Sequence, residues 1–132
     1  MIPRSLAPLV ALAAGFLASP APSADPPGST IAVELSNFAF APATIELVHG
    51  RAYALQLTNT GSGGHNFAAP RFFAAAAVDP ADRRSIRKGG IEVGKGATVT
   101  VRFTAPAAGH YDVRCTHFLH STFGMKGEIV VS

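Results

Sequence analysis

The sequence is poor in cysteine, because Cys115 is the only one among its 132 residues. A chain with a single cysteine cannot form an internal disulfide, so no covalent cross-link holds its fold together. In an oxidising compartment a lone thiol needs burial, a partner chain or a metal. If the chain is exported, Cys115 requires one of these three explanations.

A strong charge of one sign is also missing. The formal net charge is +3, from eleven basic and eight acidic residues. All eight acids lie at or after Asp25, so loss of an N-terminal segment that contains Arg4 would lower the charge only to +2. So small a basic excess argues against a nucleic-acid partner.

The first residues are typical of a secretory signal peptide. Arg4 provides a basic start, residues 6–18 form an apolar run, and small residues continue through Ala24. The run is short, and Pro20 follows it almost at once, which disfavours a membrane-spanning helix. The sequence therefore predicts export to the periplasm or beyond, with cleavage near Ala24. The alternative is an N-terminal anchor that is retained.

Removal of this segment would leave about 108 residues, enough for one compact domain and too few for two. No second apolar run is long enough to span a membrane, so we expect no stable membrane insertion of the mature chain. We expect three parts, namely a signal peptide, a flexible tether and one folded domain, at residues 1–24, 25–29 and 30–132.

Short alternating apolar runs, separated by turns, predict an all-β sandwich from Thr30 onward. Ile31, Val33 and Leu35, for example, alternate with smaller or polar residues. Strands are expected at residues 31–36, 44–47, 52–59, 90–93, 98–103, 110–115 and 127–131.

One region breaks the β pattern. Residues 70–77 do not alternate and contain four consecutive alanines, which favours a short helix. Asp79 before Pro80 resembles an N-cap followed by a first-turn proline, and predicts a second helix over residues 80–88. One or two short helices are therefore expected in the region 70–88.

The C-terminal segment carries a set of soft metal ligands. Cys115, His120 and Met125 follow one another at equal spacing, with four residues in each gap. Thiolate, imidazole and thioether ligands together suit copper, and two His with one Cys and a distant Met form the blue-copper arrangement. Strand parity turns the Cys115 thiol toward the core. Met125 could instead be a core residue that fills a gap, but its spacing and glycine neighbours favour a ligand.

The fourth ligand has to come from elsewhere, and His65 is the candidate. It follows the glycine-rich stretch 61–64, whose tight packing can bring it to the end of a sheet. His117 remains a rival to His120, since a Cys-x-His pair on an extended chain points both side chains the same way. His120 is favoured because thiolate and imidazole ligands on one copper usually need an intervening turn. His49 and His110 are expected to be ordinary solvated histidines.

Three motifs resemble those of the cupredoxins, the blue-copper family of azurin, plastocyanin, auracyanin and rusticyanin. Residues 40–50 resemble the early strand signature, residues 64–67 the segment of the first His ligand, and residues 115–127 the ligand loop. The spacing in the loop is closest to auracyanin and rusticyanin. One departure is that Thr116, His117, Phe118 and Leu119 stand between Cys and His, where the family usually has a Pro or Gly.

The resemblance implies a Greek-key β-sandwich with one copper ion that cycles between Cu(I) and Cu(II). His65, Cys115 and His120 would be strong equatorial ligands, and Met125 a weak axial one. Asn66 would tie the His65 segment to the ligand loop, although a role as a turn-former remains open.

The ligand set and the resemblance favour electron transfer as the function. We expect a monomeric carrier whose redox partner is a c-type cytochrome or a copper enzyme. Copper storage, delivery or resistance would use the same ligands and is the alternative. An oxidase or nitrite reductase would need further copper sites and His-x-His pairs, so we expect no enzyme. A metal-free adhesion domain would leave the ordered ligand set unexplained.

Overall fold

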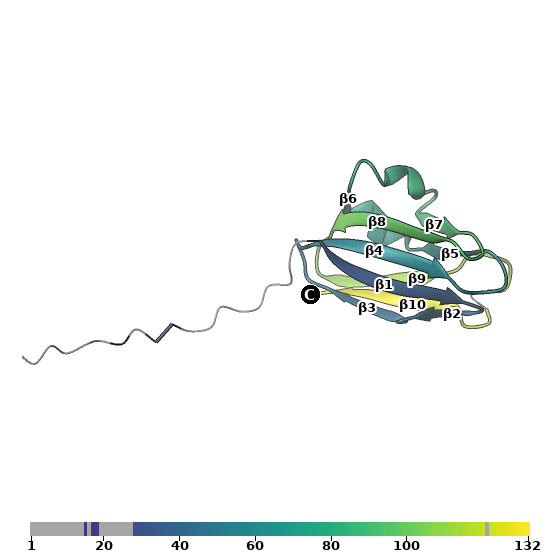
Figure 1. The fold of residues 1–132 in the computed structure, drawn as a ribbon, viewed down its shortest axis with the longest axis horizontal. Coiled ribbons are helices and arrows are strands. Elements are labelled where there is room, and N and C mark those ends of the chain that lie inside the picture. The colour runs from purple at the N-terminus through teal and green to yellow at the C-terminus, as the bar shows by residue number, and fades with distance from the viewer. Residues whose placement is uncertain (1–14, 16, 19–27, 121) are drawn as a thin grey trace, which may run out of the picture.

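The computed structural model describes residues 15, 17–18, 28–120 and 122–132 (Figure 1). The signal peptide and tether expected at residues 1–29 lie almost wholly outside the described residues. Among the described residues, no helix is long and apolar enough to cross a membrane.

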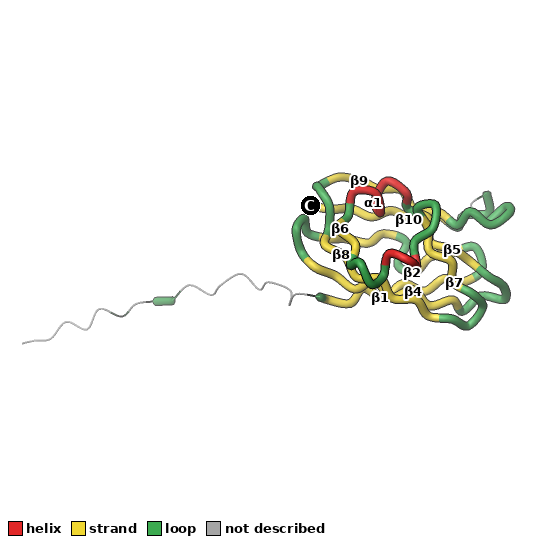
Figure 2. The backbone as a smooth tube through the Cα atoms, turned by 90° about the horizontal axis from the view of Figure 1, so that it is seen from above, coloured by secondary structure: helices red, strands yellow, loops and turns green. Residues whose placement is uncertain are grey.

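Two five-stranded sheets face each other and form the sandwich (Figures 1 and 2). The first has the order β2-β1-β4-β8-β6, with the strands Ala39–Ala41, Ser29–Ser36, Ala52–Asn59, Thr98–Thr104 and Ala77–Val78. The second has the order β3-β10-β9-β5-β7, with the strands Thr44–Leu47, Lys126–Val131, Gly109–Arg114, His65–Ala68 and Gly90–Val93. The predicted β-sandwich is confirmed.

The chain changes sheets early, so strands that are distant in sequence become neighbours. β1 lies parallel to β4, and β3 lies parallel to β10, while the other pairs are antiparallel. The pairing of Ile45 with Ile129 joins the first third of the chain to its last strand.

Alternating side chains of both sheets fill the space between them. In β4, Leu55 and Leu57 are buried, while Ala54 and Gln56 are only partly covered. Burial of each such side chain contributes about 1.5–3 kcal/mol relative to exposure. Between the sheets the rings of Phe72, Phe103 and Tyr111 meet edge to face. This core gives the end of the second sheet a rigid support.

The first predicted helix is confirmed in shortened form as α1, Pro70–Ala75, with the proline at its start. The second is wrong: residues 80–88 contain only the 3-10 turn η1, Arg83–Ser85. Asp82 is engaged elsewhere, because its carboxylate accepts hydrogen bonds from the Arg102 backbone N–H (3.0 Å) and Nε (2.8 Å) on β8. Asp79, the expected N-cap, accepts a hydrogen bond from the Ala81 N–H (2.9 Å), but only a single 3-10 turn follows it.

The end of this region is a tight turn, where the sequence suggested the stop of a helix. Arg87 and Gly90 exchange two backbone hydrogen bonds of 2.8 and 3.0 Å. Between them Lys88 and Gly89 have φ values of 51° and 74°, the double positive φ of a hairpin turn that leads into β7. Gly89 therefore serves a β-turn and leads the chain into the second sheet.

Candidate metal centre

The second sheet brings the candidate ligands to one end of the sandwich, away from the C-terminus (Figure 1). His65 is the first residue of β5, and Cys115 follows β9 directly. Ala68 of β5 pairs with Arg114 of β9, so the two strands are neighbours. The glycine-rich stretch was expected to bring His65 to the end of a sheet, and the residue begins the strand β5.

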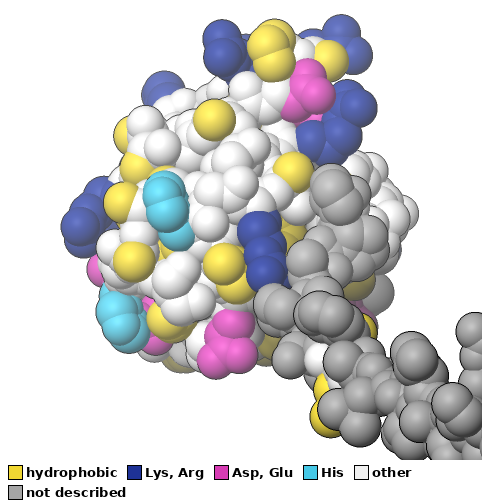
Figure 3. Space-filling model, turned by 90° about the vertical axis from the view of Figure 1, so that its left-hand side faces the viewer, with side chains coloured by type: hydrophobic (Ala, Val, Ile, Leu, Met, Phe, Trp, Pro, Cys, Tyr) yellow, Lys and Arg dark blue, Asp and Glu magenta, His cyan; other side chains and the backbone are white. Residues whose placement is uncertain are grey.

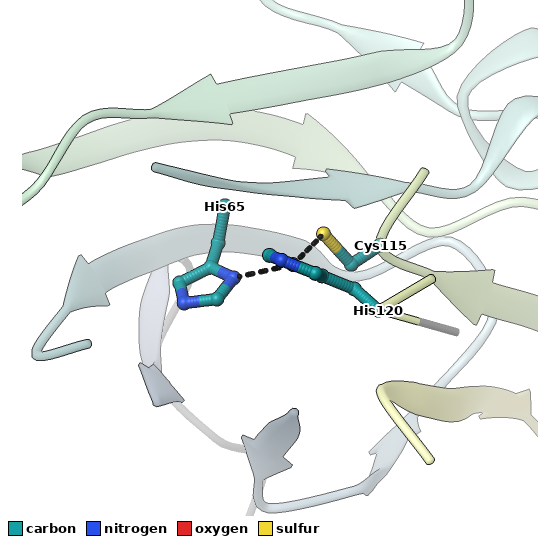
Figure 4. Close-up of side chains that lie close together, drawn as sticks. All are labelled: His65, Cys115 and His120. Carbon is teal, nitrogen blue, oxygen red and sulfur yellow. Dashed lines mark hydrogen bonds between the residues drawn. The ribbon is translucent and has the colours of Figure 1, made fainter. Parts of the chain in front are cut away.

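Three donor atoms converge there (Figure 4). Nδ1 of His65 lies 3.1 Å from Nδ1 of His120, and the latter lies 3.4 Å from Sγ of Cys115. All three lie within 4.8 Å of one another. Donors bonded to one ion at about 2.0–2.3 Å, with angles of 90–120°, lie roughly 3–4 Å apart. The spacing therefore suits a single metal ion.

The group of three candidate ligands is buried on one side and reaches the protein surface on the other. His65 is 2% exposed and Cys115 fully buried, whereas His120 is only partly buried. Desolvation, followed by the proximity of His120 and His117, lowers the pKa of His65 below its ordinary value of 6.5. A neutral imidazole is the form that binds metal. The lowered pKa favours this neutral form of His65.

The hydrogen bonding of these rings also fits a metal. When both rings carry their proton on Nε2, the two Nδ1 atoms face each other with free lone pairs, which is the tautomer that binding of one ion requires. The buried Nε2 of His65 has no hydrogen-bond partner among the described residues. Together with the thiol, the donor set is soft and nitrogen-rich, which is the combination that copper prefers.

Asn66 connects the two halves of the centre. Its backbone N–H donates to Cys115 Sγ at 3.5 Å. Its side chain accepts from the Thr116 N–H (2.8 Å) and donates to Thr116 Oγ1 (2.6 Å) and Glu92 Oε1 (3.0 Å). Because Asn66 lies in β5 and bonds across to the ligand loop, it is not a turn-former.

Comparison with known proteins agrees with this fold. A family described as cupredoxin-like domain matches residues 8–131. The chain belongs to the cupredoxin-like family. No curated protein sequence matches the chain.

Solved structures of other cupredoxins have the same fold. Sodium-dithionite-reduced auracyanin from the photosynthetic bacterium Roseiflexus castenholzii is 22% identical, with a TM-score of 0.60 over 81% of this chain and 99% of that one. Auracyanin B is 20% identical, with a TM-score of 0.58 over 83% of this chain and 93% of that one. The resemblance to auracyanin noted in the ligand spacing thus extends to the fold.

In this cupredoxin, backbone hydrogen bonds hold the ligand loop together. The Met125 N–H donates to the His120 carbonyl (3.0 Å), and the Cys115 N–H donates to the Met125 carbonyl (3.1 Å). Met125 is fully buried. Three of the four predicted ligands are therefore tied to one another through the main chain.

The other histidines of this cupredoxin have partners that the sequence did not suggest. His117 lies outside the converging group, with Nε2 2.9 Å from Glu92 Oε2. His110 is exposed, as expected, and pairs with Glu128. His49 is also exposed, and its Nδ1 lies 2.8 Å from the Pro106 carbonyl, to which it donates.

Sequence reasoning missed Asn59, which shapes the glycine-rich loop. Asn59 is 1% exposed; its Nδ2 donates to the carbonyls of Gly63 (2.8 Å) and Val93 (2.9 Å), and its Oδ1 accepts from the Gly61 N–H (2.8 Å). A Cβ on Gly61 would lie 2.5 Å from His65 Nε2. The loop can therefore pass the His65 ring only with glycine at this position.

Phe38 was missed as well. It has a φ of 62°, and its ring meets His120 edge-on at 5.3 Å and Phe123 at 5.5 Å. Four exposed apolar side chains near His120 form what we call the apolar patch: Phe38, Phe118, Leu119 and Phe123. Only the last three follow from the ligand-loop sequence.

Proposed function

We propose that this cupredoxin is an exported type 1 copper protein that carries single electrons between redox partners. The observation that supports it best is the convergence of Cys115 Sγ with the Nδ1 atoms of His65 and His120. One end of this group is buried in the core, and the other approaches the surface at His120. A carrier needs this combination of a protected ion and an accessible ligand.

In the proposal His65, Cys115 and His120 would hold copper strongly, and Met125 would be a weaker fourth ligand. When bound, copper supplies a one-electron couple between Cu(I) and Cu(II). The sandwich holds its ligands in one arrangement, so little has to move when the charge of the site changes. The Asn66 N–H directed at Sγ and the apolar packing around the thiol tune the potential.

The remaining parts of the proposal concern the setting of the protein. The apolar N-terminal run supports export to the periplasm, and one cysteine without a disulfide partner suits a thiol that is protected by metal. We propose a monomer that meets a c-type cytochrome or a copper enzyme. No catalytic residues are assigned.

Copper storage or delivery is the second candidate function, and His117 beside the site favours it. Its ring centroid lies 5.5 Å from that of His120, so it could receive an ion that leaves the centre. The two functions differ in copper release. We expect a carrier to retain its ion in the presence of a competing chelator, and a delivery protein to pass the ion to an acceptor.

An absorption spectrum of the copper-loaded mature protein tests the main proposal. We expect intense visible thiolate-to-copper absorption that disappears on reduction and returns on oxidation. Copper binding without this absorption would reject the proposed site.

A further inference from the structure

Glu92 lies at the edge of the metal centre, with each carboxylate oxygen engaged. On β7 it stands directly opposite Asn66 of β5. Oε1 accepts from Asn66 Nδ2 at 3.0 Å, and Oε2 lies 2.9 Å from His117 Nε2. The side chain is 66% exposed, yet both of its oxygens are fixed. Such a carboxylate can orient a neighbouring imidazole.

His117 is the imidazole that this carboxylate holds. Its ring stacks beside His120, with centroids 5.5 Å apart and planes 29° apart, and its centroid lies 6.5 Å from that of His65. Despite this proximity, the donor group within the described residues comprises His65, Cys115 and His120 and does not include His117. The sequence alone left His117 as a rival ligand, so something has to keep it apart.

We propose that Glu92 is a positioning residue that keeps His117 out of the coordination shell. This inference rests on the copper site proposed above. The bond between an imidazole N–H and a carboxylate is stronger than one between neutral groups, and it fixes both the tautomer and the plane of the ring. In the held orientation the His117 ring lies alongside His120, with Nε2 directed away toward β7.

Loss of the Glu92 carboxylate would free the ring. A freely rotating imidazole close to Cu(II) competes with the other ligands, because imidazole nitrogen is a ligand well suited to copper. An additional or exchanged imidazole favours a tetragonal site with a weaker copper–thiolate bond. Glu92 would thus select which of two neighbouring histidines binds the metal.

The test compares Glu92→Ala with Glu92→Ala/His117→Ala and with His117→Ala, each loaded with one Cu(II) per chain. We expect the visible thiolate band of Glu92→Ala to change by at least about two-fold in intensity per copper. The double variant and His117→Ala should match the wild type. Glu128→Ala is the matched control, because it removes the same kind of carboxylate from His110.

A second readout needs no metal. In the metal-free wild type the Nε2–H proton of His117 should give a slowly exchanging NMR signal, because Glu92 accepts its hydrogen bond. Glu92→Ala should lose this signal, while Glu128→Ala should keep it.

An unchanged copper spectrum in Glu92→Ala would overturn the inference. So would an altered spectrum that persists in the double variant, because Glu92 would then act through Asn66. If the wild type itself lacked thiolate-to-copper absorption, the proposed function would be rejected. This outcome is distinguishable from the two outcomes that overturn only the role of Glu92.

Discussion

Cys115 carries the only thiol of the chain and directly follows β9. Its side chain is fully buried, and its Sγ lies 3.4 Å from Nδ1 of His120. We expect Cys115→Ser to lose the visible charge-transfer band, because a serine oxygen is a harder and weaker copper ligand. The sandwich should persist, since the substitution changes little volume.

Two measurements check this outcome, the visible spectrum after copper addition and far-ultraviolet circular dichroism. A Cys115→Ser protein that keeps its blue or green colour would refute the assignment of the thiolate.

Met125 and His120 should respond differently to substitution. Met125→Leu removes only a weak axial bond, so copper should remain and the reduction potential should rise. His120→Ala removes a strong ligand and opens the site to water, so copper should be lost or the thiolate band abolished. Copper analysis and redox titration distinguish the two. If His117→Ala damaged the site more than His120→Ala, the choice between these histidines would be wrong.

Asn59 should matter for stability. Its amide makes three hydrogen bonds to the backbone in a buried position, so Asn59→Ala leaves polar groups without partners. We expect the free energy of unfolding to fall by about 1–3 kcal/mol. Urea denaturation of the metal-free protein measures it. Asn37→Ala is the control, because Asn37 is exposed and its side chain hydrogen-bonds Ser62 of the same loop; an equal loss there would contradict the role of burial.

At the scale of the elements, the ligand loop should form the docking surface. The apolar patch surrounds His120, and Phe118 is 86% exposed. A small apolar interface suits a weak, rapidly dissociating redox encounter. We expect Phe118→Asp or Leu119→Asp to lower the rate of electron transfer strongly, and the wild-type rate to depend little on ionic strength.

The competing surface is the segment around η1, where Arg83 and Arg84 are exposed. Figure 3 shows several Lys and Arg side chains at the top of the face that it draws, and others scattered over the same face. Stopped-flow transfer rates at several salt concentrations discriminate between the two surfaces. Steep salt dependence that disappears in Arg83→Ala/Arg84→Ala would move docking to this segment.

Strands with one buried face could be predicted from the sequence, and the strands that the sequence missed are fully buried or very short. β4 alternates over eight residues, and its predicted bounds match the structure. All four residues of β5 are buried, so no alternation marks the strand. β2 and β6 have three and two residues, too few for a pattern. The helix expected over residues 80–88 was wrong although its predicted N-cap forms, because local signals do not include long-range contacts such as that of Asp82 with Arg102, twenty residues away in sequence.

The residues of the candidate metal site could likewise be predicted only in part from the sequence. Cys115, His120 and Met125 are regularly spaced in one segment, so their chemistry could be read directly. His65 could be added because a soft-metal site lacked a ligand, and the structure brings its Nδ1 to the others. Glu92 and Phe38 could not be found in this way, because only the pairing of strands places them beside the loop.

At the scale of the whole molecule, the bond between Asp82 and Arg102 ties the η1 segment to the first sheet. Hydrogen bonds from the Arg102 side chain and backbone lower the pKa of Asp82 below its ordinary value of 3.8. A carboxyl with a lowered pKa in the folded state stabilises the fold above its ordinary pKa and loses that contribution as the pH falls through the lowered value. The affected window therefore lies below about pH 4.

We expect Asp82→Asn to reduce the difference between the urea midpoints measured at about pH 6 and about pH 3, by destabilising the protein mainly at the higher pH. Asp112→Asn, at an exposed position on β9, is the control. An Asp82→Asn protein as stable as the wild type at the higher pH would contradict the proposed contribution.

The parallel pairing of β3 with β10 bears on the order of events during synthesis. β10 lies between β3 and β9 in the second sheet, and Met125 immediately precedes it. A nascent chain that has not yet released β10 from the ribosome lacks the strand that joins β3 to β9. Contacts so distant in sequence also form slowly, because a long loop must close first. The loop that carries Cys115 and His120 is therefore anchored at both ends only once β10 has paired with β9.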